Sequence, residues 1–185
     1  MCGLAGLMTR SAAPDGGILD KLQQALAHRG PDGAGHHVAG PLGIVHTRLA
    51  IIDLQTGDQP LRDADGRALA CNGEIYNYVE LRREMGEARF ATASDCEPPL
   101  HLLAREREAF VRPLRGMYAI AAAEPGGERA YLARDPFGIK PLYVCEGAHG
   151  IAFASEPRAF FAAGLARAEL VAHKRDELLQ LQFTS

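Results

Sequence analysis

The sequence has no run of Lys or Arg and no excess of basic charge, because 20 basic and 23 acidic side chains give a formal net charge of -3. Proteins that bind nucleic acids or anionic membranes usually carry a basic patch. The sequence also lacks an apolar stretch of the roughly 20 residues that span a bilayer, and its start lacks the basic region of a signal peptide. We therefore expect a cytoplasmic protein that binds small molecules or other proteins, with no nucleic acid and no membrane.

Recognisable cysteine patterns are also missing. The four cysteines, Cys2, Cys71, Cys96 and Cys145, form no C-x-x-C pair and have no histidine at a zinc-ligand spacing, so neither a metal site nor a disulfide framework is predicted. Three of them are expected to be small hydrophobic residues. Cys2 differs, because removal of Met1 would make it the first residue of the chain.

The length of 185 residues and the hydrophobic fraction of 47% are typical of one globular domain. Short strands are expected in two groups, with a glycine-rich loop over 27–35. The strands are predicted at 4–8, 42–46, 50–53, 67–71, 117–123, 129–134, 142–146 and 151–155, and the helices at 18–26, 78–85, 98–107, 157–165 and 174–182. Strands grouped in runs, without strict alternation with helices, favour an α+β layered fold.

An N-terminal cysteine carries a thiol and a free α-amine on one residue. The α-amine has a pKa of roughly 7.7 to 8.0, so much of it is neutral near physiological pH and can accept the thiol proton. A terminal amine then replaces the histidine that usually activates a nucleophile. Cys2 alone is weak evidence, because most proteins that begin Met-Cys use that cysteine for no chemistry.

Seven motifs follow Cys2 in order, over about residues 2 to 160. They are His28-Arg29-Gly30-Pro31-Asp32; Arg48-Leu49-Ala50-Ile51-Ile52-Asp53 with Gln59-Pro60; Asn72-Gly73-Glu74-Ile75-Tyr76-Asn77; Ser94-Asp95-Cys96-Glu97; Arg115-Gly116-Met117-Tyr118-Ala119; Arg134 through Tyr143; and Phe153-Ala154-Ser155-Glu156. Together they resemble the glutaminase half of glutamine-hydrolysing asparagine synthetases, within the class II, or N-terminal-nucleophile, glutamine amidotransferases.

The resemblance implies a four-layer αββα sandwich of two stacked sheets, formed by an amidotransferase domain over residues 2–165. Residues 166–185 would then begin a linker toward a synthetase domain. The synthetase's Ser-Gly-Gly pyrophosphate loop does not occur in this sequence. The chain is thus expected to be either an excised part of a longer enzyme or a free-standing subunit, and a homodimer is possible.

The resemblance also implies the catalytic residues. The Cys2 thiol would attack the side-chain amide of L-glutamine and form a glutamyl thioester, while its α-amine passes the proton to departing ammonia. The Asn72 side chain and the Gly73 backbone N–H would hold the oxyanion, since glycine allows close approach of the backbone. Read alone, Asn-Gly instead favours a hairpin turn.

The same resemblance assigns the substrate-binding residues. Arg48 would grip the α-carboxylate of glutamine, because a guanidinium suits bidentate pairing, and Asp95 would pair with the α-ammonium. Glu74 and the backbone at Ile51 and Ile52 would complete the pocket. Asp95 could instead merely cap the helix that follows it. The loop at 28–32 resembles a lid and the segment 134–143 resembles scaffold, so neither is assigned chemistry.

The glutaminase step is expected to need no cofactor and no metal, and ATP and Mg²⁺ are implied only for the missing synthetase part. Ammonia would pass to an asparagine-synthetase-like domain or subunit. Two alternatives remain. The chain could be a glutaminase for another pathway, such as amino-sugar, purine or cell-surface amidation, or it could bind glutamine without hydrolysing it.

Overall fold

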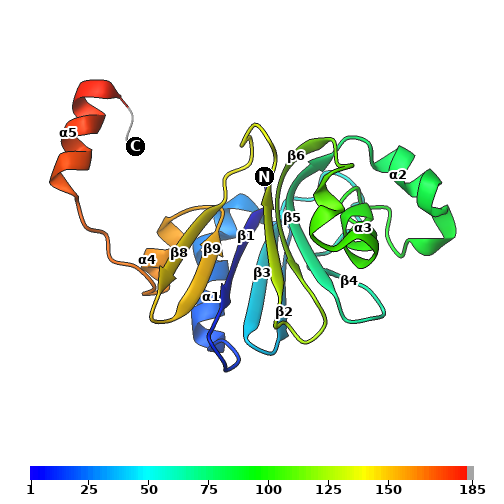
Figure 1. The fold of residues 1–185 in the computed structure, drawn as a ribbon, viewed down its shortest axis with the longest axis horizontal. Coiled ribbons are helices and arrows are strands. Elements are labelled where there is room, and N and C mark those ends of the chain that lie inside the picture. The colour runs from blue at the N-terminus through cyan, green and yellow to red at the C-terminus, as the bar shows by residue number, and fades with distance from the viewer. Residues whose placement is uncertain (183–185) are drawn as a thin grey trace.

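The computed structural model describes residues 1–182, and its centre is a five-stranded antiparallel sheet (Figure 1). The sheet has the strand order β2-β3-β1-β9-β8, so β1 is its central strand. Its strands are β1 (Gly3–Met8), β2 (Gly33–Ala39), β3 (Leu42–Arg48), β8 (Tyr143–Gly147) and β9 (Gly150–Ala154). Every residue of β3 is buried, because the chain covers both faces of this sheet.

A second antiparallel sheet, of four strands, stacks on the first. Its order is β4-β5-β6-β7, and β5 and β6 pair along their whole lengths. The strands are β4 (Leu61–Arg62), β5 (Ala68–Ile75), β6 (Gly116–Ala123) and β7 (Ala130–Arg134). A turn at Gly126 and Gly127 joins β6 to β7, and both glycines have positive φ.

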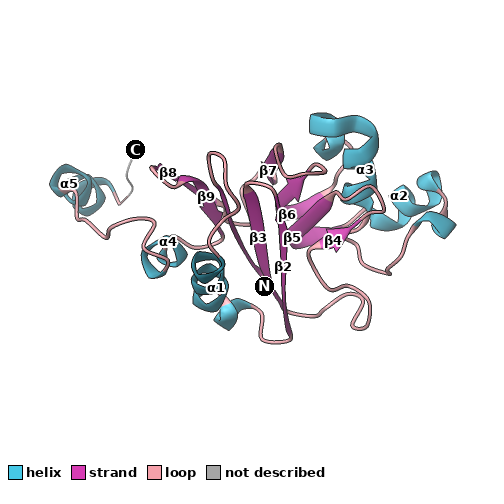
Figure 2. Ribbon diagram, turned by 90° about the horizontal axis from the view of Figure 1, so that it is seen from below, coloured by secondary structure: helices cyan, strands magenta, loops and turns pink. Residues whose placement is uncertain are grey.

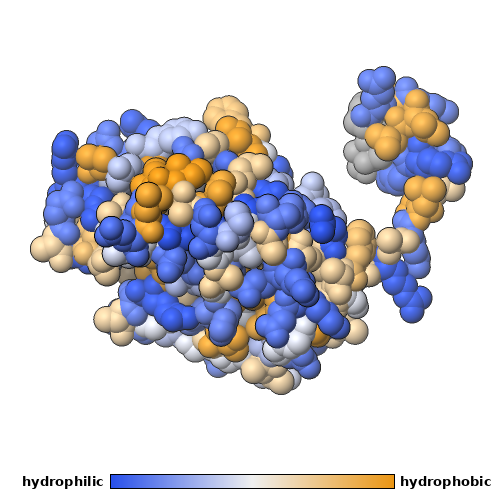
Figure 3. Space-filling view, turned by 180° about the vertical axis from the view of Figure 1, so that it is seen from behind, coloured by the Kyte–Doolittle hydropathy of each residue, from blue (hydrophilic) through white to orange (hydrophobic). Residues whose placement is uncertain are grey.

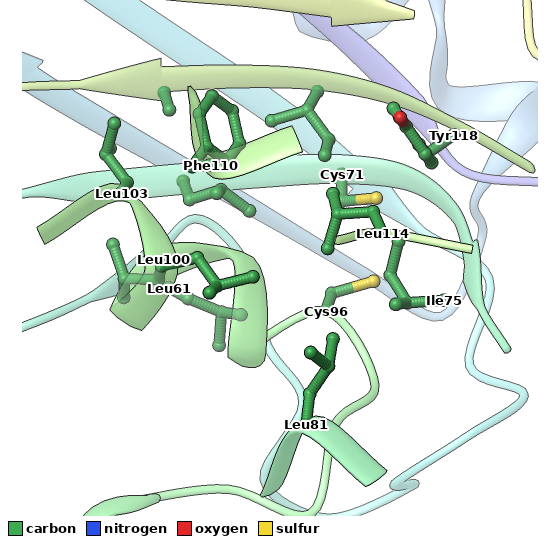
Figure 4. Packing of buried hydrophobic residues seen from close by; sticks show 14 residues of the cluster. Leu61, Cys71, Ile75, Leu81, Cys96, Leu100, Leu103, Phe110, Leu114 and Tyr118 are labelled. Carbon is green, nitrogen blue, oxygen red and sulfur yellow. The ribbon is translucent and has the colours of Figure 1, made fainter. Parts of the chain in front are cut away.

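Helices cover the outer face of each sheet (Figure 2). The first sheet is covered by α1 (Gly16–Ala25) and by α4 (Arg158–Ala162), and the short 3-10 helix η1 (Ala27–Arg29) follows α1 in the chain. The second is covered by α2 (Tyr78–Met85), η2 (Glu87–Arg89), α3 (Pro98–Glu106) and η3 (Arg107–Val111). Figure 4 shows Leu100, Leu103 and Phe110 packed from these helical segments toward strand β5.

Between the sheets, small side chains of one sheet meet large side chains of the other. The second sheet contributes mainly alanines to this layer, and the first contributes Leu4, Leu42, Ile44 and Phe153. A Cβ at Gly6 would lie 2.3 Å from the Phe153 ring, so glycine makes room for that ring. Three separate buried clusters, two outer and one inner, confirm the expected α+β sandwich with four αββα layers.

Most predicted elements are present, and two segments were predicted wrongly. The loop expected over 27–35 ends early, because residues 33–35 already belong to β2. Gly35 is part of a strand rather than a turn, and a Cβ there would lie 2.1 Å from the Gln59 carbonyl oxygen. The strand expected at 50–53 is a loop, in which Ile51 is 62% exposed and Asp53 has a φ of 54°.

The C-terminal helix α5 (Ala172–Leu181) stands apart from the sandwich (Figures 1 and 3). None of its residues is buried, whereas Leu165 and Ala166 still pack on the outer face of the first sheet. The expectation that 166–185 leads toward a further domain stays a prediction, and its last three residues lie outside the described ones. No helix within residues 1–182 is long and apolar enough to cross a membrane.

Candidate active site

Strand alternation brings three of the predicted residues to one end of the layer between the sheets. Side chains alternate between the two faces of a strand. Leu4 on β1, Ile44 on β3 and Ala70 on β5 face the inner layer. Positions two or four residues further along each strand toward this end are Cys2, Arg48 and Asn72. The thiol of the predicted nucleophile, the guanidinium and the carboxamide therefore converge there.

A small pocket of about 80 Å³ opens at this end of the sandwich. The eight residues predicted from the sequence all line it: Cys2, Arg48, Ile51, Ile52, Asn72, Gly73, Glu74 and Asp95. Eight further residues complete the wall: Met1, Leu49, Gly57, Gln59, Cys71, Ser94, Cys96 and Lys140. Residues that are up to 139 positions apart in the sequence, from Met1 to Lys140, therefore meet in one cavity.

The Cys2 thiol is held by the backbone of Leu49. The Leu49 N–H donates to Cys2 Sγ at 3.4 Å, and Sγ lies 3.7 Å from the Leu49 carbonyl oxygen. Burial raises the pKa of the Cys2 thiol above its ordinary value, and the Leu49 N–H offsets part of that rise by favouring the thiolate. The thiol is thus protonated at neutral pH, and a base must remove its proton before attack.

Asn72 and Gly73 lie inside β5, paired with Ala119 and Tyr118, so the hairpin-turn interpretation of Asn-Gly is wrong. Asn72 is 1% exposed, and its Nδ2 has no hydrogen-bond partner within the described part of the chain. Buried amide groups are nearly always hydrogen-bonded. The Asn72 side chain is therefore an unused donor at the pocket wall.

The backbone N–H of Gly73 points away from the neighbouring strand β6. On the same strand, Cys71 N donates to Gln59 Oε1 at 2.6 Å and Ile75 N donates to Asp95 Oδ2 at 2.8 Å. Alternate residues of an antiparallel strand direct their N–H groups to the same side. The Gly73 N–H lies between these two, on the side where the pocket residues Gln59 and Asp95 stand.

Glycine at position 73 is also required by the close approach of β6. A Cβ there would lie 2.3 Å from the Met117 carbonyl oxygen and 2.7 Å from Tyr118 Cα. Both are backbone atoms of a paired strand and cannot move aside cheaply. The reason for glycine at this position thus includes strand packing, which the sequence alone did not indicate.

Arg48 is buried and its guanidinium is already engaged. Nη1 donates to Asp58 Oδ1 at 2.9 Å, and Nη2 donates to the carbonyl oxygens of Ile52 and Asp53. The Asp58 side chain is 82% exposed, whereas that of Arg48 is 9% exposed. A Cβ at Gly57 would lie 2.7 Å from Arg48 Nη2, so glycine leaves room for the guanidinium.

Asp95 does not cap helix α3, so that alternative interpretation is wrong. The N-cap residue is Glu97, and Pro98 and Pro99 stand in the first turn. The Asp95 carboxylate instead binds Ile75 N at 2.8 Å. Burial raises the pKa of Asp95, and the nearby charge of Glu74 adds to the rise, so a cation placed beside these two carboxylates would be stabilised.

Several functional contacts were missed by the sequence analysis. Arg29, in the segment assigned no chemistry, donates from Nε to the Cys2 carbonyl oxygen at 3.0 Å and from Nη1 to Glu156 Oε1 at 2.7 Å. Cys71 and Cys96, expected to be plain hydrophobic residues, line the pocket. The motifs of the sequence analysis include Arg29 and Cys96 and could have indicated these two contacts, but no motif includes Cys71. The residue types themselves suggest solvated charge or core.

Asn77 belongs to the same motif as Asn72 and Gly73. It occupies the N-cap position of α2, but its side chain makes no capping hydrogen bond. Its amide instead donates to the Pro113 carbonyl oxygen and accepts from Arg115 N, both at 2.9 Å.

Among residues 1–182, no group of His, Cys, Asp and Glu side chains is arranged to hold a metal ion.

Comparison with known proteins decides the family. The protein-family model described as "Glutamine amidotransferase domain" matches residues 1–185. The chain belongs to the glutamine amidotransferase domain family. This confirms the resemblance drawn from the motifs, and it makes the protein an enzyme domain of the amidotransferase type.

The amidotransferase domain is similar to part of several glutamine-hydrolysing asparagine synthetases. It is 40% identical over 166 residues to asparagine synthetase 2 of Bacillus subtilis (strain 168), covering 87% of this chain and 22% of that enzyme. It is 41% identical over 164 residues to asparagine synthetase 3 of Arabidopsis thaliana, covering 86% of this chain and 28% of the relative. The chain thus spans about a quarter of the length of the curated relatives it matches.

Solved structures confirm the fold of the amidotransferase domain. It superposes on the glutamine phosphoribosylpyrophosphate amidotransferase of B. subtilis, complexed with ADP and GMP, with a TM-score of 0.71 at 24% identity, covering 88% of this chain and 44% of the other. The structure of the allosteric regulatory enzyme of purine biosynthesis gives a TM-score of 0.70 at 23% identity, covering 89% of this chain and 43% of that one.

Proposed function

We propose that this domain hydrolyses L-glutamine to L-glutamate and ammonia, with Cys2 as the nucleophile once Met1 has been removed. The observation that carries the proposal is the pair of donors beside Cys2. The unpartnered Asn72 Nδ2 and the outward Gly73 N–H both belong to the pocket that contains the thiol. Preorganised donors of this kind stabilise the oxyanion of a tetrahedral intermediate.

The chemical steps follow from the residues present. The Cys2 α-amine takes the thiol proton, Sγ attacks the side-chain carbonyl carbon, and the oxyanion forms at Asn72 and Gly73. The intermediate collapses with expulsion of the amide nitrogen, which leaves as ammonia after receiving the proton from the α-amine. Water then hydrolyses the glutamyl thioester, releasing glutamate and restoring the thiol.

Substrate binding uses the charged groups around the pocket mouth. Arg48 pairs with the α-carboxylate of glutamine, with the backbone at Ile51 and Ile52 beside it. Asp95 and Glu74 pair with the α-ammonium, since a cation offsets the burial of two neighbouring carboxylates. Support for this division comes from the position of all five residues on the wall of one pocket.

Processing of the N-terminus is part of the proposal. Met1 lines the pocket, and while it is present Cys2 has no free α-amine to act as base. Because burial raises the pKa of the thiol, direct ionisation cannot replace this base at neutral pH. We expect kcat/KM to rise with pH along a limb with an apparent pKa near that of an α-amine, about 8. A limb above pH 9 would instead indicate direct ionisation of the thiol.

The released ammonia is proposed to pass to an asparagine-synthetase-like domain or subunit in the cytoplasm. The support is the 40% and 41% identity to parts of enzymes named asparagine synthetases. The glutaminase step uses no cofactor in this proposal, and ATP and Mg²⁺ belong to the synthetase part. The acceptor is tested by adding aspartate and ATP with the candidate partner and measuring asparagine. Glutamine hydrolysis without asparagine formation would favour another acceptor.

The decisive experiment is mass spectrometry of the purified chain after incubation with 6-diazo-5-oxo-norleucine. We expect loss of Met1 and one adduct on Cys2. Cys2→Ala should abolish the adduct and glutamate release while the domain stays folded, and Cys145→Ala, a cysteine outside the pocket wall, should retain both. Glutamate release by Cys2→Ala would refute the mechanism, and glutamine binding by a processed chain without hydrolysis would favour a binding module.

A further inference from the structure

Lys140 is a buried cation on the pocket wall that the proposed mechanism does not use. It is 7% exposed, and it lines the same cavity as Cys2. Within residues 1–182, no hydrogen bond or ion pair of its ammonium group is found, although its backbone is fully engaged. The Lys140 ammonium keeps some contact with solvent, so it is available to pair with an anionic group that enters the pocket from outside.

The loop between β7 and β8 holds Lys140 in a fixed position. The Asp135 carboxylate accepts hydrogen bonds from the backbone N–H of Phe137, Ile139 and Lys140. Arg134 donates from Nε to the Lys140 carbonyl oxygen at 2.8 Å. Lys140 is thus bound at its backbone N–H by one side chain and at its carbonyl oxygen by another, so the side chain projects from a rigid base.

The same loop requires a glycine next to this base. Gly138 has a φ of 63°, a conformation that favours glycine. A Cβ there would lie 2.9 Å from Arg134 Nη2, the atom that donates to the Gly138 carbonyl oxygen at 2.7 Å. The local sequence therefore builds a support for Lys140, in a segment that the sequence analysis assigned only to scaffold.

The charges along the pocket wall leave one end of the ligand for Lys140. Arg48 is assigned to the α-carboxylate, and Glu74 and Asp95 are assigned to the α-ammonium. The donors beside Cys2, Asn72 and Gly73, are neutral. Glutamine and glutamate share both α-groups and differ at the side-chain end, where glutamine carries a neutral amide and glutamate a carboxylate. A cation at that end distinguishes the two molecules.

We propose that Lys140 is a specificity-determining residue that binds the γ-carboxylate of product glutamate and thereby strengthens product binding relative to substrate binding. This inference rests on the proposed glutaminase function of the pocket. Charge-assisted hydrogen bonds to a carboxylate are stronger than neutral ones, and more so where water is largely excluded.

The test uses calorimetric titration of glutamine and of glutamate into the Cys2→Ala variant, in which no turnover occurs. Adding Lys140→Met should weaken glutamate binding on the order of tenfold, equivalent to about 1.4 kcal/mol, with little change for glutamine. Lys140→Arg, which keeps the charge, should retain most of the glutamate affinity. Active enzyme with Lys140→Met should show a correspondingly higher inhibition constant for glutamate at similar KM for glutamine.

The outcomes separate the two proposals. If Cys2→Ala binds neither ligand, the proposed function of the pocket fails. If it binds both and Lys140→Met weakens neither, Lys140 has no role in binding and the inference is refuted. Equal weakening of both ligands would place Lys140 at an α-group and would also refute it. Lys140→Gln replaces Lys140→Met if thermal denaturation shows that the methionine variant does not fold.

Discussion

Replacing Asn72 by alanine should separate activity from stability. The Asn72 amide is 1% exposed with an unpartnered Nδ2, so the folded protein already lacks a hydrogen bond there. Leaving a buried donor unsatisfied costs about 1–3 kcal/mol, and this cost disappears in the variant, offsetting the loss of packing. We therefore expect the free energy of unfolding to change by less than about 1 kcal/mol. Loss of one oxyanion donor should lower kcat by about 10² to 10³.

Asn77 provides a matched control five residues along the chain. Its side chain makes two hydrogen bonds at 2.9 Å, to the Pro113 carbonyl oxygen and from Arg115 N. At about 0.5–1.5 kcal/mol each, Asn77→Ala should lower the free energy of unfolding by about 1–3 kcal/mol with little change in kcat. Urea unfolding and a coupled assay for glutamate release measure both quantities. An Asn72→Ala variant that loses stability like Asn77→Ala, but keeps kcat within tenfold of wild type, would refute the assignment of Asn72.

Three further substitutions test other parts of the site. Gly73→Ala should lower the free energy of unfolding by about 1–3 kcal/mol in urea titrations, because its Cβ would lie 2.3 Å from the Met117 carbonyl oxygen. Asp58→Asn should lower KM for glutamine severalfold by releasing Arg48, and a higher KM would show that Asp58 positions the guanidinium. Burial lowers the pKa of His46 from 6.5 to about 4, so between these pH values the unfolded state binds a proton more readily than the folded state. The free energy of unfolding therefore falls as the pH drops from about 6.5 to about 4. His46→Gln should remove up to about 3 kcal/mol of that pH dependence.

The elements that the sequence predicted well are those indicated by a local residue pattern. Helix α2 begins and ends at the predicted residues, Tyr78 and Met85, and β6 follows an unbroken apolar run. The pocket residues were predicted only because seven motifs stood in a known order. No local pattern around Arg48 or Asp95 distinguishes a ligand from a solvated charge.

Two kinds of feature could not be predicted, because they depend on distant parts of the chain. Gly35 looks like a turn residue, yet its role is to admit the Gln59 carbonyl oxygen beside β2. Arg29 looks like a loop charge, yet it binds the Cys2 carbonyl oxygen and Glu156, 127 residues away. Such contacts are set by the stacking of layers, which residue types and spacing do not encode locally.

The position of Cys2, the proposed nucleophile, follows from the register of the central strand. β1 pairs with β3 on one side and β9 on the other, and Gly3 stands opposite Thr47. The next position outward sets Cys2 beside Arg48 on the inner face, while a slip of one residue would turn every side chain of β1 to the opposite face. The proposed nucleophile is thus fixed by two neighbouring strands. The Arg29 hydrogen bond to the Cys2 carbonyl oxygen then holds this residue, which lies just beyond the N-terminal end of β1.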